Sequence, residues 1–328
     1  MDIEWRPGSS LEILKSRASL LSSVRDFFSQ RGLFEVETPI LAQHTVSEPH
    51  IKSFEVGCSC DGNKKLNTGF LQTSPEYFMK RLLATDNQPI FQICKAFRDE
   101  EKGRNHNPEF TLLEWYQPGY DHRELMLEVR ELIDSLYFSK NKTLSWEEFT
   151  YQALFEKFLD INPHLVSLEL LANLCEPYVG KEQIESLTRD DCLDLLLSHK
   201  IAPKFKNESA VFIYEFPQSQ AALAKLKKNQ EGVLVASRFE LIINGLEIAN
   251  GYHELTDYEE QKKRFSQDNN KRKESGKDRI EIDGKFLAAL KEGLPECAGV
   301  AIGLDRLLMV LYDVESITEV QAFSVDRN

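Results

Sequence analysis

The dipeptide Asn244-Gly245 lies between two apolar runs and constrains the fold more than any other feature of the sequence. Both residues tolerate the positive φ angles of a type I′ turn, so residues 232–243 and 246–252 are expected to form a β-hairpin. Further strand patterns occur at 34–37, 90–98, 109–117, 209–215 and 297–303. Strands that return through hairpins, with helical patterns between them, predict an α+β fold on an antiparallel sheet flanked by helices.

Helical spacing of apolar residues predicts a first helix that Ser9 or Ser10 caps and that Gly32 ends. Pro75 marks the expected first position of another helix. Residues 257–275, 284–292 and those from about Asp305 are expected to be helical, and 123–200 mostly helical.

The overall composition excludes several classes of protein. The chain carries 53 acidic and 40 basic residues, a net charge of −13, which disfavours general binding to polyanions. No apolar run is long enough for a membrane span, and the first residues lack the apolar core of a signal peptide, so a cytoplasmic location is expected. Six scattered cysteines, including Cys58 and Cys60, form no Cys-x-x-Cys pair and are expected to be reduced thiols.

The predicted hairpin places two carboxylates on one face of the sheet. With a two-residue loop, 242 pairs with 247, so Glu240 shares a face with Glu247 and with Arg238. Carboxylates this close repel each other, and Mg²⁺ would relieve the repulsion. The alternative is a solvated outer face on which Arg238 is the counter-charge.

Two other segments carry candidate phosphate ligands. Arg98 ends one strand, where its guanidinium fork could meet a phosphate and a carboxylate, and Phe110 on the returning strand offers a stacking surface. Taken alone, these residues also suit a structural ion pair and a core position. Near the C-terminus, the glycine-rich strand 297–303 is followed by Arg306 at the start of a helix, where backbone N–H groups favour anions.

These segments resemble, in order, the three signature motifs of the class II aminoacyl-tRNA synthetases. Residues 32–39 resemble motif 1, residues 97–110 motif 2 and Gly303-Leu304-Asp305-Arg306 motif 3. The resemblance runs from about residue 10 to the end and implies a single catalytic domain over 1–328. Residues 247–255 are similar to the lysine-pocket segment of the lysyl enzymes.

Two departures from the lysyl enzymes point to a subfamily. Nothing before residue 10 corresponds to their N-terminal anticodon-binding OB-fold domain, and Ala301 replaces a glycine beside the amino-acid pocket. Both features resemble the truncated paralogues that attach (R)-β-lysine to a lysine of elongation factor P. The resemblance therefore implies ATP, (R)-β-lysine or lysine and elongation factor P as substrates, Mg²⁺ as cofactor, a homodimer formed through motif 1, and no tRNA substrate.

The resemblance also implies roles for individual residues. Arg98 would hold the α-phosphate and the attacking carboxylate, and Arg306 the γ-phosphate and one adenine face. The further ATP contacts would be Asp99, Glu100, His106, Asn107, Phe110, Glu240, Leu241, Gly299 and Gly303. Glu240 and Glu247 would bind the metal. The amino acid would meet Ser74, Pro75, Glu76, Tyr116, Glu247, Asn250, Glu254 and Ala301.

Two rival functions remain open at this point. One is a small enzyme that aminoacylates tRNA, and the other is a regulatory paralogue that binds an amino acid without catalysis. A second open question concerns residues 262–279, which hold eight lysine and arginine residues in an otherwise acidic chain. This segment is either a solvated helix face or a docking patch for an acidic protein partner.

Overall fold

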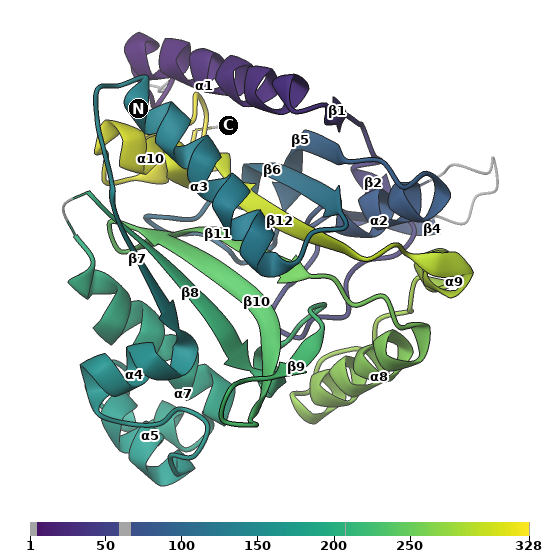
Figure 1. Cartoon of the computed structure of the whole chain (residues 1–328), viewed down its shortest axis with the longest axis vertical. Coiled ribbons are helices and arrows are strands. Elements are labelled where there is room, and N and C mark those ends of the chain that lie inside the picture. Colours follow the sequence, from purple (N-terminus) through teal and green to yellow (C-terminus); the bar gives the residue numbers. More distant parts are fainter. Residues whose placement is uncertain (1–4, 59–66, 207, 328) are drawn as a thin grey trace. The chain divides into compact units, whose positions relative to one another are not determined.

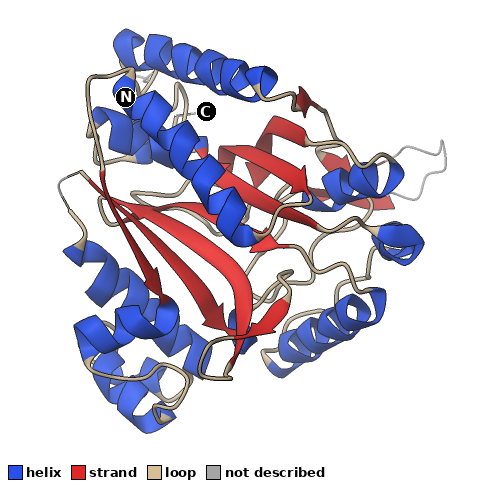
Figure 2. Ribbon diagram, in the orientation of Figure 1, coloured by secondary structure: helices blue, strands red, loops and turns tan. Residues whose placement is uncertain are grey.

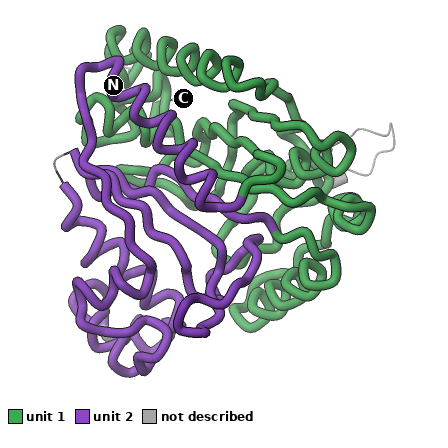
Figure 3. The backbone as a smooth tube through the Cα atoms, in the orientation of Figure 1, with its two compact units in different colours: residues 1–120, 255–328 green, residues 121–254 purple. Residues whose placement is uncertain are grey.

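The computed structural model describes residues 5–58, 67–206 and 208–327. The chain divides into two compact units, Met1–Tyr120 with Leu255–Asn328, and Asp121–Glu254 (Figure 3). Cys60 lies outside the described residues, and Cys94, Cys175, Cys192 and Cys297 are free thiols. Within the described part of the chain, no helix has both the length and the apolar character that a bilayer crossing requires.

The first unit is built on four strands in the order β1-β5-β6-β12 (Figure 1). They are β1 (Phe34–Glu35), β5 (Ile90–Phe97), β6 (Glu109–Pro118) and β12 (Cys297–Gly303). β1 runs parallel to β5, whereas β5 and β12 both pair with β6 in antiparallel ladders. A smaller sheet has the order β2-β4-β3, with β2 (Leu41–Ala42), β3 (Glu55–Cys58) and β4 (Asn67–Leu71).

Helix α1 (Leu11–Gln30) covers one face of this sheet. Ser10 caps it as expected, because its Oγ accepts a hydrogen bond from the backbone N of Ile13 at 3.2 Å. The fully buried Phe28 packs against Phe91 of β5 and Trp115 of β6, with ring centroids 4.8 and 5.0 Å apart. These aromatic contacts fix α1 on the sheet and leave the opposite face of β5 and β6 for other side chains.

The described residues of the first unit also form the α-helices α2 (Glu76–Thr85), α8 (Tyr258–Glu274), α9 (Gly284–Gly293) and α10 (Leu304–Tyr312). The expected first helical position, Pro75, is instead the N-cap of α2 and makes no side-chain capping bond. Tyr77 of α2 stacks on Phe286 of α9 with centroids 4.4 Å apart, and Phe265 of α8 lies beside both rings. The three helices therefore share one aromatic core.

The second unit contains a sheet in which strands have the order β11-β10-β8-β7, and β9 pairs with β10 (Figure 2). The strands are β7 (Ser145–Thr150), β8 (Ser209–Pro217), β9 (Leu226–Lys228), β10 (Leu234–Ile243) and β11 (Leu246–His253). Helix α3 (His122–Phe138) packs against β10 and β11. On the other face, Val211, Ile213 and Ile242 join the buried core of α4 (Tyr151–Leu159), α5 (Leu168–Cys175) and α7 (Arg189–Leu196). Helix α6 is short (Lys181–Ile184).

The predicted mostly helical region, 123–200, holds these helices but also strand β7. This strand runs parallel to β8 at the end of the sheet, and three of its six side chains are exposed. Such an edge strand shows little apolar alternation, so its sequence pattern did not reveal it.

The Asn244-Gly245 turn is confirmed. Asn244 has φ 52° and Gly245 φ 81°, and the ladder begins with Ile243 opposite Leu246 and Ile242 opposite Glu247. A side chain at Gly245 would also place a Cβ 3.0 Å from the carbonyl oxygen of Ala202. Positive φ and this close approach together require glycine here.

His122, the first residue of α3, is a buried titratable group of the second unit. Its imidazole is buried, with Nε2 3.4 Å from the Nζ of Lys227. Burial, and after it the charge of Lys227, lower the pKa of His122 from 6.5 to about 3.

We expect stability to fall as the pH drops from 6.5 toward 3, because the unfolded chain then binds a proton that folded His122 does not. This residue should contribute up to about 1.4 kcal/mol per pH unit to the slope. The check is the free energy of urea unfolding between pH 4 and 8. His122→Gln should flatten the curve below pH 6.5, and a variant curve parallel to that of the wild type would assign the acid sensitivity to other groups.

Candidate active site

One face of β6, with the residues that pair with it, carries five candidate residues of the first unit. Alternation along the strand places Phe110, Leu112, Glu114 and Tyr116 on this face, as predicted. Residues opposite one another in an antiparallel ladder share a face. The facing partners in β12 are Gly303, Ala301 and Gly299, and those in β5 are Ala96, Cys94, Gln92 and Ile90. Three small residues of β12 therefore border the side chains of β6.

Glu114 and Tyr116 form a buried polar pair at one end of this face. They are 3% and 2% exposed, and the Tyr116 hydroxyl donates to Glu114 Oε1 at 2.7 Å. Ala301 lies opposite Glu114 in the ladder. Alternation along the strand predicted that Glu114 lies on the same face as Tyr116, but Glu114 was not among the predicted site residues. Its position beside Tyr116 was the sequence feature that could have identified it. A buried carboxylate beside small side chains suits a cationic group of a substrate.

Gln92 is a second residue on this face that was not predicted to belong to the site. It lies opposite Glu114 in β5, and its buried Oε1 has no hydrogen-bond partner among the described residues. Gln92 also lines a small hollow together with Ser74 and Pro75. The loop before α2 therefore lies next to Gln92 on this face of the sheet.

Glu76, the first residue of α2, is already paired. Its carboxylate accepts from the Nζ of Lys80 at 2.6 Å, and Lys80 is 1% exposed. The backbone N of Glu76 donates to Ser74 Oγ at 3.4 Å. If Glu76 also binds a substrate amine, its carboxylate must contact two ammonium groups, that of the substrate and that of the buried Lys80.

Arg98 follows β5 and lies over Phe110. Its guanidinium carbon is 5.1 Å from the Phe110 ring centroid, and Nη1 is 3.6 Å from Glu101 Oε1. The Nε of Arg98 is buried and has no hydrogen-bond partner among the described residues. The structure thus joins a stacking surface to a guanidinium group that has a donor to offer.

The next two candidates contact a lysine. Asp99 Oδ2 is 3.0 Å from the Nζ of Lys52, and Glu100 pairs with the same ammonium group at 2.5 Å. Glu100 has φ 68° and a largely exposed side chain. In this structure both carboxylates anchor the segment around Lys52 to the end of β5.

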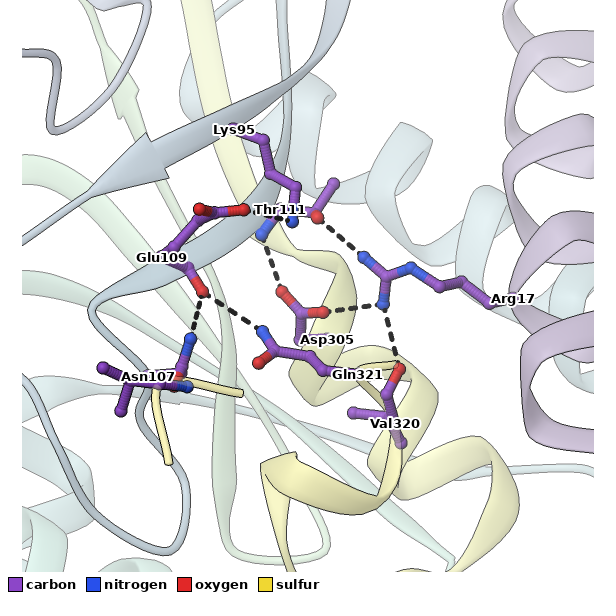
Figure 4. Close-up of polar contacts among 9 residues, drawn as sticks. Arg17, Lys95, Asn107, Glu109, Thr111, Asp305, Val320 and Gln321 are labelled. Atoms are coloured by element: carbon purple, nitrogen blue, oxygen red, sulfur yellow. Dashed lines mark hydrogen bonds and ion pairs between the residues drawn. The ribbon is translucent and has the colours of Figure 1, made fainter. Parts of the chain in front are cut away.

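The polar loop 101–108 reaches Arg306 in the first turn of α10. Arg306 Nε donates to the carbonyl oxygen of Asn105 at 3.2 Å, and Nη2 contacts His106 Nε2. Asn107 differs from the expectation of an ATP contact, because it is buried and both ends of its amide hold the backbone. Its Nδ2 donates to the Glu109 carbonyl at 2.7 Å, and its Oδ1 accepts from the N of Val325 at 3.0 Å (Figure 4).

The second unit brings together the two acidic candidates of the hairpin. Ile242 pairs with Glu247, which places Glu247 on the Glu240 face, as predicted. A bulge after this pair, which was not predicted, then sets Glu240 opposite Asn250. Arg238 links the group, since Nη2 donates to Glu240 Oε1 at 2.5 Å and Nε to Asn250 Oδ1 at 3.2 Å.

The alternative of a solvated outer face is wrong for Glu240. Its side chain is 11% exposed, and Ile242 on the same face belongs to the buried core. Burial raises the pKa of Glu240 above its usual range; Arg238 opposes this rise and the charge of Glu247 adds to it.

Two carboxylates on one face fit Mg²⁺, which is commonly held by one or two carboxylates together with substrate phosphates. In the described part of the chain, no group of three or more His, Cys, Asp and Glu side chains is arranged to hold a metal ion. The two carboxylates of Glu240 and Glu247 are therefore suited to a metal ion that is also bound by a substrate phosphate.

The remaining two candidates of the second unit are both buried. Leu241 points to the face opposite Glu240, next to Phe239 and Phe212, which leaves only its backbone for contact with a nucleotide. Glu254 is 1% exposed, and its backbone forms a bridge with Ala224.

Comparison with known proteins assigns the family. The family described as tRNA synthetases class II (D, K and N) matches residues 2–327. The elongation factor P--(R)-beta-lysine ligase of Pectobacterium atrosepticum is 44% identical over 324 residues and covers 98% of each chain. The proteins of the same name from Edwardsiella ictaluri and Pasteurella multocida are 44% and 42% identical, also over 98% of each chain. The chain belongs to the class II tRNA synthetase family of the D, K and N type.

Proposed function

We propose that this chain is an ATP-dependent ligase that activates (R)-β-lysine, or lysine, as its adenylate. It then transfers the aminoacyl group to the ε-amino group of a lysine on elongation factor P. The observation that carries the proposal is the single face of β5, β6 and β12, with Arg98 over Phe110 at one end and the buried Glu114–Tyr116 pair opposite Ala301 at the other. Relatives that share about 44% identity over 98% of their length bear this activity in their name.

In the first step, an oxygen of the amino-acid carboxylate attacks the α-phosphorus of ATP, and the bond to pyrophosphate breaks. Arg98 binds the α-phosphate and the carboxylate, which brings the reacting atoms into contact. Arg98 and Arg306 stabilise the negative charge on the phosphoryl oxygens as it develops. Phe110 orients the nucleotide by stacking on adenine.

In the second step, the neutral ε-amine of the acceptor lysine attacks the carbonyl carbon of the adenylate. An amide bond forms, AMP leaves with the electron pair of the broken carbon–oxygen bond, and the amine nitrogen releases one proton to the solvent. The chain needs no covalent intermediate for this transfer, because the mixed anhydride is already activated.

The substrate amino acid carries two amines, and the buried carboxylate of Glu114 suits one of them. Tyr116 orients that carboxylate through its 2.7 Å hydrogen bond, and Ala301 limits the space opposite it. The resemblance assigns Ser74, Pro75, Glu76, Glu247, Asn250 and Glu254 to the same amino acid.

Glu240 and Glu247 are the residues that would hold Mg²⁺. When bound, the ion supplies positive charge to the phosphates. The role of Arg238 would be to orient the buried Glu240 carboxylate and to oppose the rise in its pKa that burial causes.

The proposal extends to the organisation of the protein. The two units form one catalytic domain, since the family matches both across residues 2–327. The protein is a cytoplasmic homodimer that uses motif 1, residues 32–39, as its interface. Acceptor assays with elongation factor P and with tRNA separate the protein ligase from a tRNA-aminoacylating enzyme, and pyrophosphate exchange separates both from a regulatory paralogue.

Arg98→Ala is expected to lower the rate of ATP–pyrophosphate exchange by about 10²–10³, because a transition-state contact is lost. The unfolding temperature should stay close to that of the wild type. Arg130→Ala, which removes an exposed ion pair on α3, is the matched control and should retain full exchange. Near-normal exchange by folded Arg98→Ala would remove Arg98 from the mechanism.

Ala301→Gly is expected to shift the preference from (R)-β-lysine toward α-lysine. The change removes one methyl group opposite Glu114, and a methyl in a tight pocket is worth about 1–3 kcal/mol of discrimination. The measurement is the ratio of kcat/KM for the two amino acids in pyrophosphate exchange. An unchanged ratio would exclude Ala301 from the basis of specificity.

Helix α8 offers a docking surface for an acidic region of the acceptor protein. Phe265 and the buried Gln261 and Asn269 anchor one side of the helix. Two arginines that the sequence assigned to the patch serve the fold, since Arg264 pairs with Glu260 and Arg272 donates to the carbonyl of Asp278. Lys277 donates to the carbonyl of Pro49. Exposed positions are held by Lys262, Lys263, Lys271, Lys273 and Arg279.

Replacement of Lys271, Lys273 and Arg279 by glutamate should slow transfer to elongation factor P at low salt and leave pyrophosphate exchange unchanged. Electrostatic docking acts mainly on association and weakens with salt. The control replaces Lys15, Lys228 and Lys285, three exposed lysines outside α8, by glutamate and thus changes the net charge equally. Equal transfer rates for the two triple variants would mean that the acceptor binds elsewhere.

A further inference from the structure

A buried carboxylate connects two elements that carry proposed ATP contacts. Asp305 Oδ2 accepts from the backbone N of Thr111 in β6 at 2.6 Å, and Oδ1 accepts from Arg17 Nη1 at 2.7 Å (Figure 4). Arg17, from α1, also donates through Nη2 to Thr111 Oγ1 at 2.6 Å and through Nη1 to the carbonyl of Val320 at 3.3 Å. One ion pair thus joins α1, β6, α10 and the C-terminal segment.

The position of Asp305 follows from the way the sheet ends. The ladder between β6 and β12 finishes with Leu112 opposite Gly303, and the chain then turns into α10. Thr111 is the next residue of β6 and has no pairing partner in β12. The Asp305 carboxylate supplies the missing acceptor and so continues the ladder by one side-chain bond.

The Arg17–Asp305 ion pair is buried, so its geometry tolerates little displacement. The side chains of Asp305 and Arg17 are 2% and 18% exposed. Loss of one partner would leave a charge without compensation in the interior, a costly state that the surrounding structure must relieve by moving.

Each anchored residue stands next to a proposed ATP contact. Thr111 follows Phe110, the residue proposed for adenine, and Asp305 precedes Arg306, the residue proposed for the γ-phosphate. We infer that Arg17 and Asp305 are positioning residues that set the distance between these two ATP contacts. The inference rests on the proposed function, because it requires that ATP is the ligand of Phe110 and Arg306.

A second set of bonds supports the same arrangement. The Glu109 carbonyl accepts from Asn107 Nδ2 at 2.7 Å and from Gln321 Nε2 at 3.2 Å (Figure 4). The N of Val325 donates to Asn107 Oδ1 at 3.0 Å. Residues 320–325 therefore hold the beginning of β6 on the side where Arg17 and Asp305 hold Thr111.

The test measures binding of AMP and of the non-hydrolysable ATP analogue AMP-PNP to the wild type, Arg17→Ala, Arg17→Lys and Arg25→Ala. Arg25 is the matched control, because it lies on the same helix and forms an exposed pair with Glu35. Both nucleotides carry the adenine that Phe110 and Arg306 are proposed to meet, but only the triphosphate also reaches the γ-phosphate contact of Arg306. A displacement of about 1 Å can reduce the rate about 10²-fold. We therefore expect Arg17→Ala to lose at least tenfold more affinity for AMP-PNP than for AMP, and kcat/KM for ATP to fall while KM for the amino acid is unchanged.

Arg17→Lys should recover part of the affinity for AMP-PNP, because an ammonium group can reach Asp305 but lacks the fork that also binds Thr111. Arg25→Ala should bind both nucleotides as the wild type does. Asp305→Asn provides a milder variant if Arg17→Ala does not fold.

Equal losses for AMP and AMP-PNP, together with a lower unfolding temperature, would overturn the inference and leave the pair a purely structural role. Unchanged binding of both nucleotides by a folded Arg17→Ala would overturn it as well. If the wild type binds neither nucleotide and catalyses no pyrophosphate exchange, the proposed function itself fails and the inference fails with it.

Discussion

The antiparallel ladder through β6 is the constraint on which the first unit depends. The pleat of this strand sends Thr111, Leu113 and Trp115 to the α1 side, where Trp115 packs against Phe28. It sends Phe110, Glu114 and Tyr116 to the other side, toward the small residues of β12. Because the side-chain period of a strand is two residues, a shift of one residue would exchange the core for the candidate site. The aromatic packing on one face thus secures the polar constellation on the other.

The features that could be predicted from the sequence are those set by local periodicity. The Asn244-Gly245 turn specifies its own hairpin, and alternation then places Glu240 and Glu247 on one face. The same alternation groups Phe110 with Glu114 and Tyr116. By contrast, the bulge beyond Glu247 and the edge strand β7 depend on tertiary pairing that leaves no mark in a short window of sequence.

Polar contacts between residues far apart in the chain could not be predicted from the sequence either. Arg17 and Asp305 are 288 residues apart, and Asn107 meets Val325 across 218 residues. Sequence alone marks Asn107 as one more polar residue in a loop rich in possible ligands, whereas burial shows that its amide satisfies two backbone groups. A polar residue beside a ligand motif is therefore as suited to holding the motif in place as to touching the ligand.

The buried carboxylates of this acidic chain differ in their hydrogen-bond partners. Three of the buried carboxylates are of two kinds: Asp305 and Glu240 are paired with guanidinium groups, whereas Glu114 accepts a hydrogen bond from the hydroxyl of Tyr116. A guanidinium partner already compensates the first kind of carboxylate, which leaves it suited to orientation. A carboxylate of the second kind suits an incoming ammonium group, because a nearby positive charge favours the ionised form that burial disfavours. If the substrate amine binds at Glu114, an analogue without that amine would lose this charge interaction, so selection for the charged substrate follows from the position of Glu114 on the sheet face.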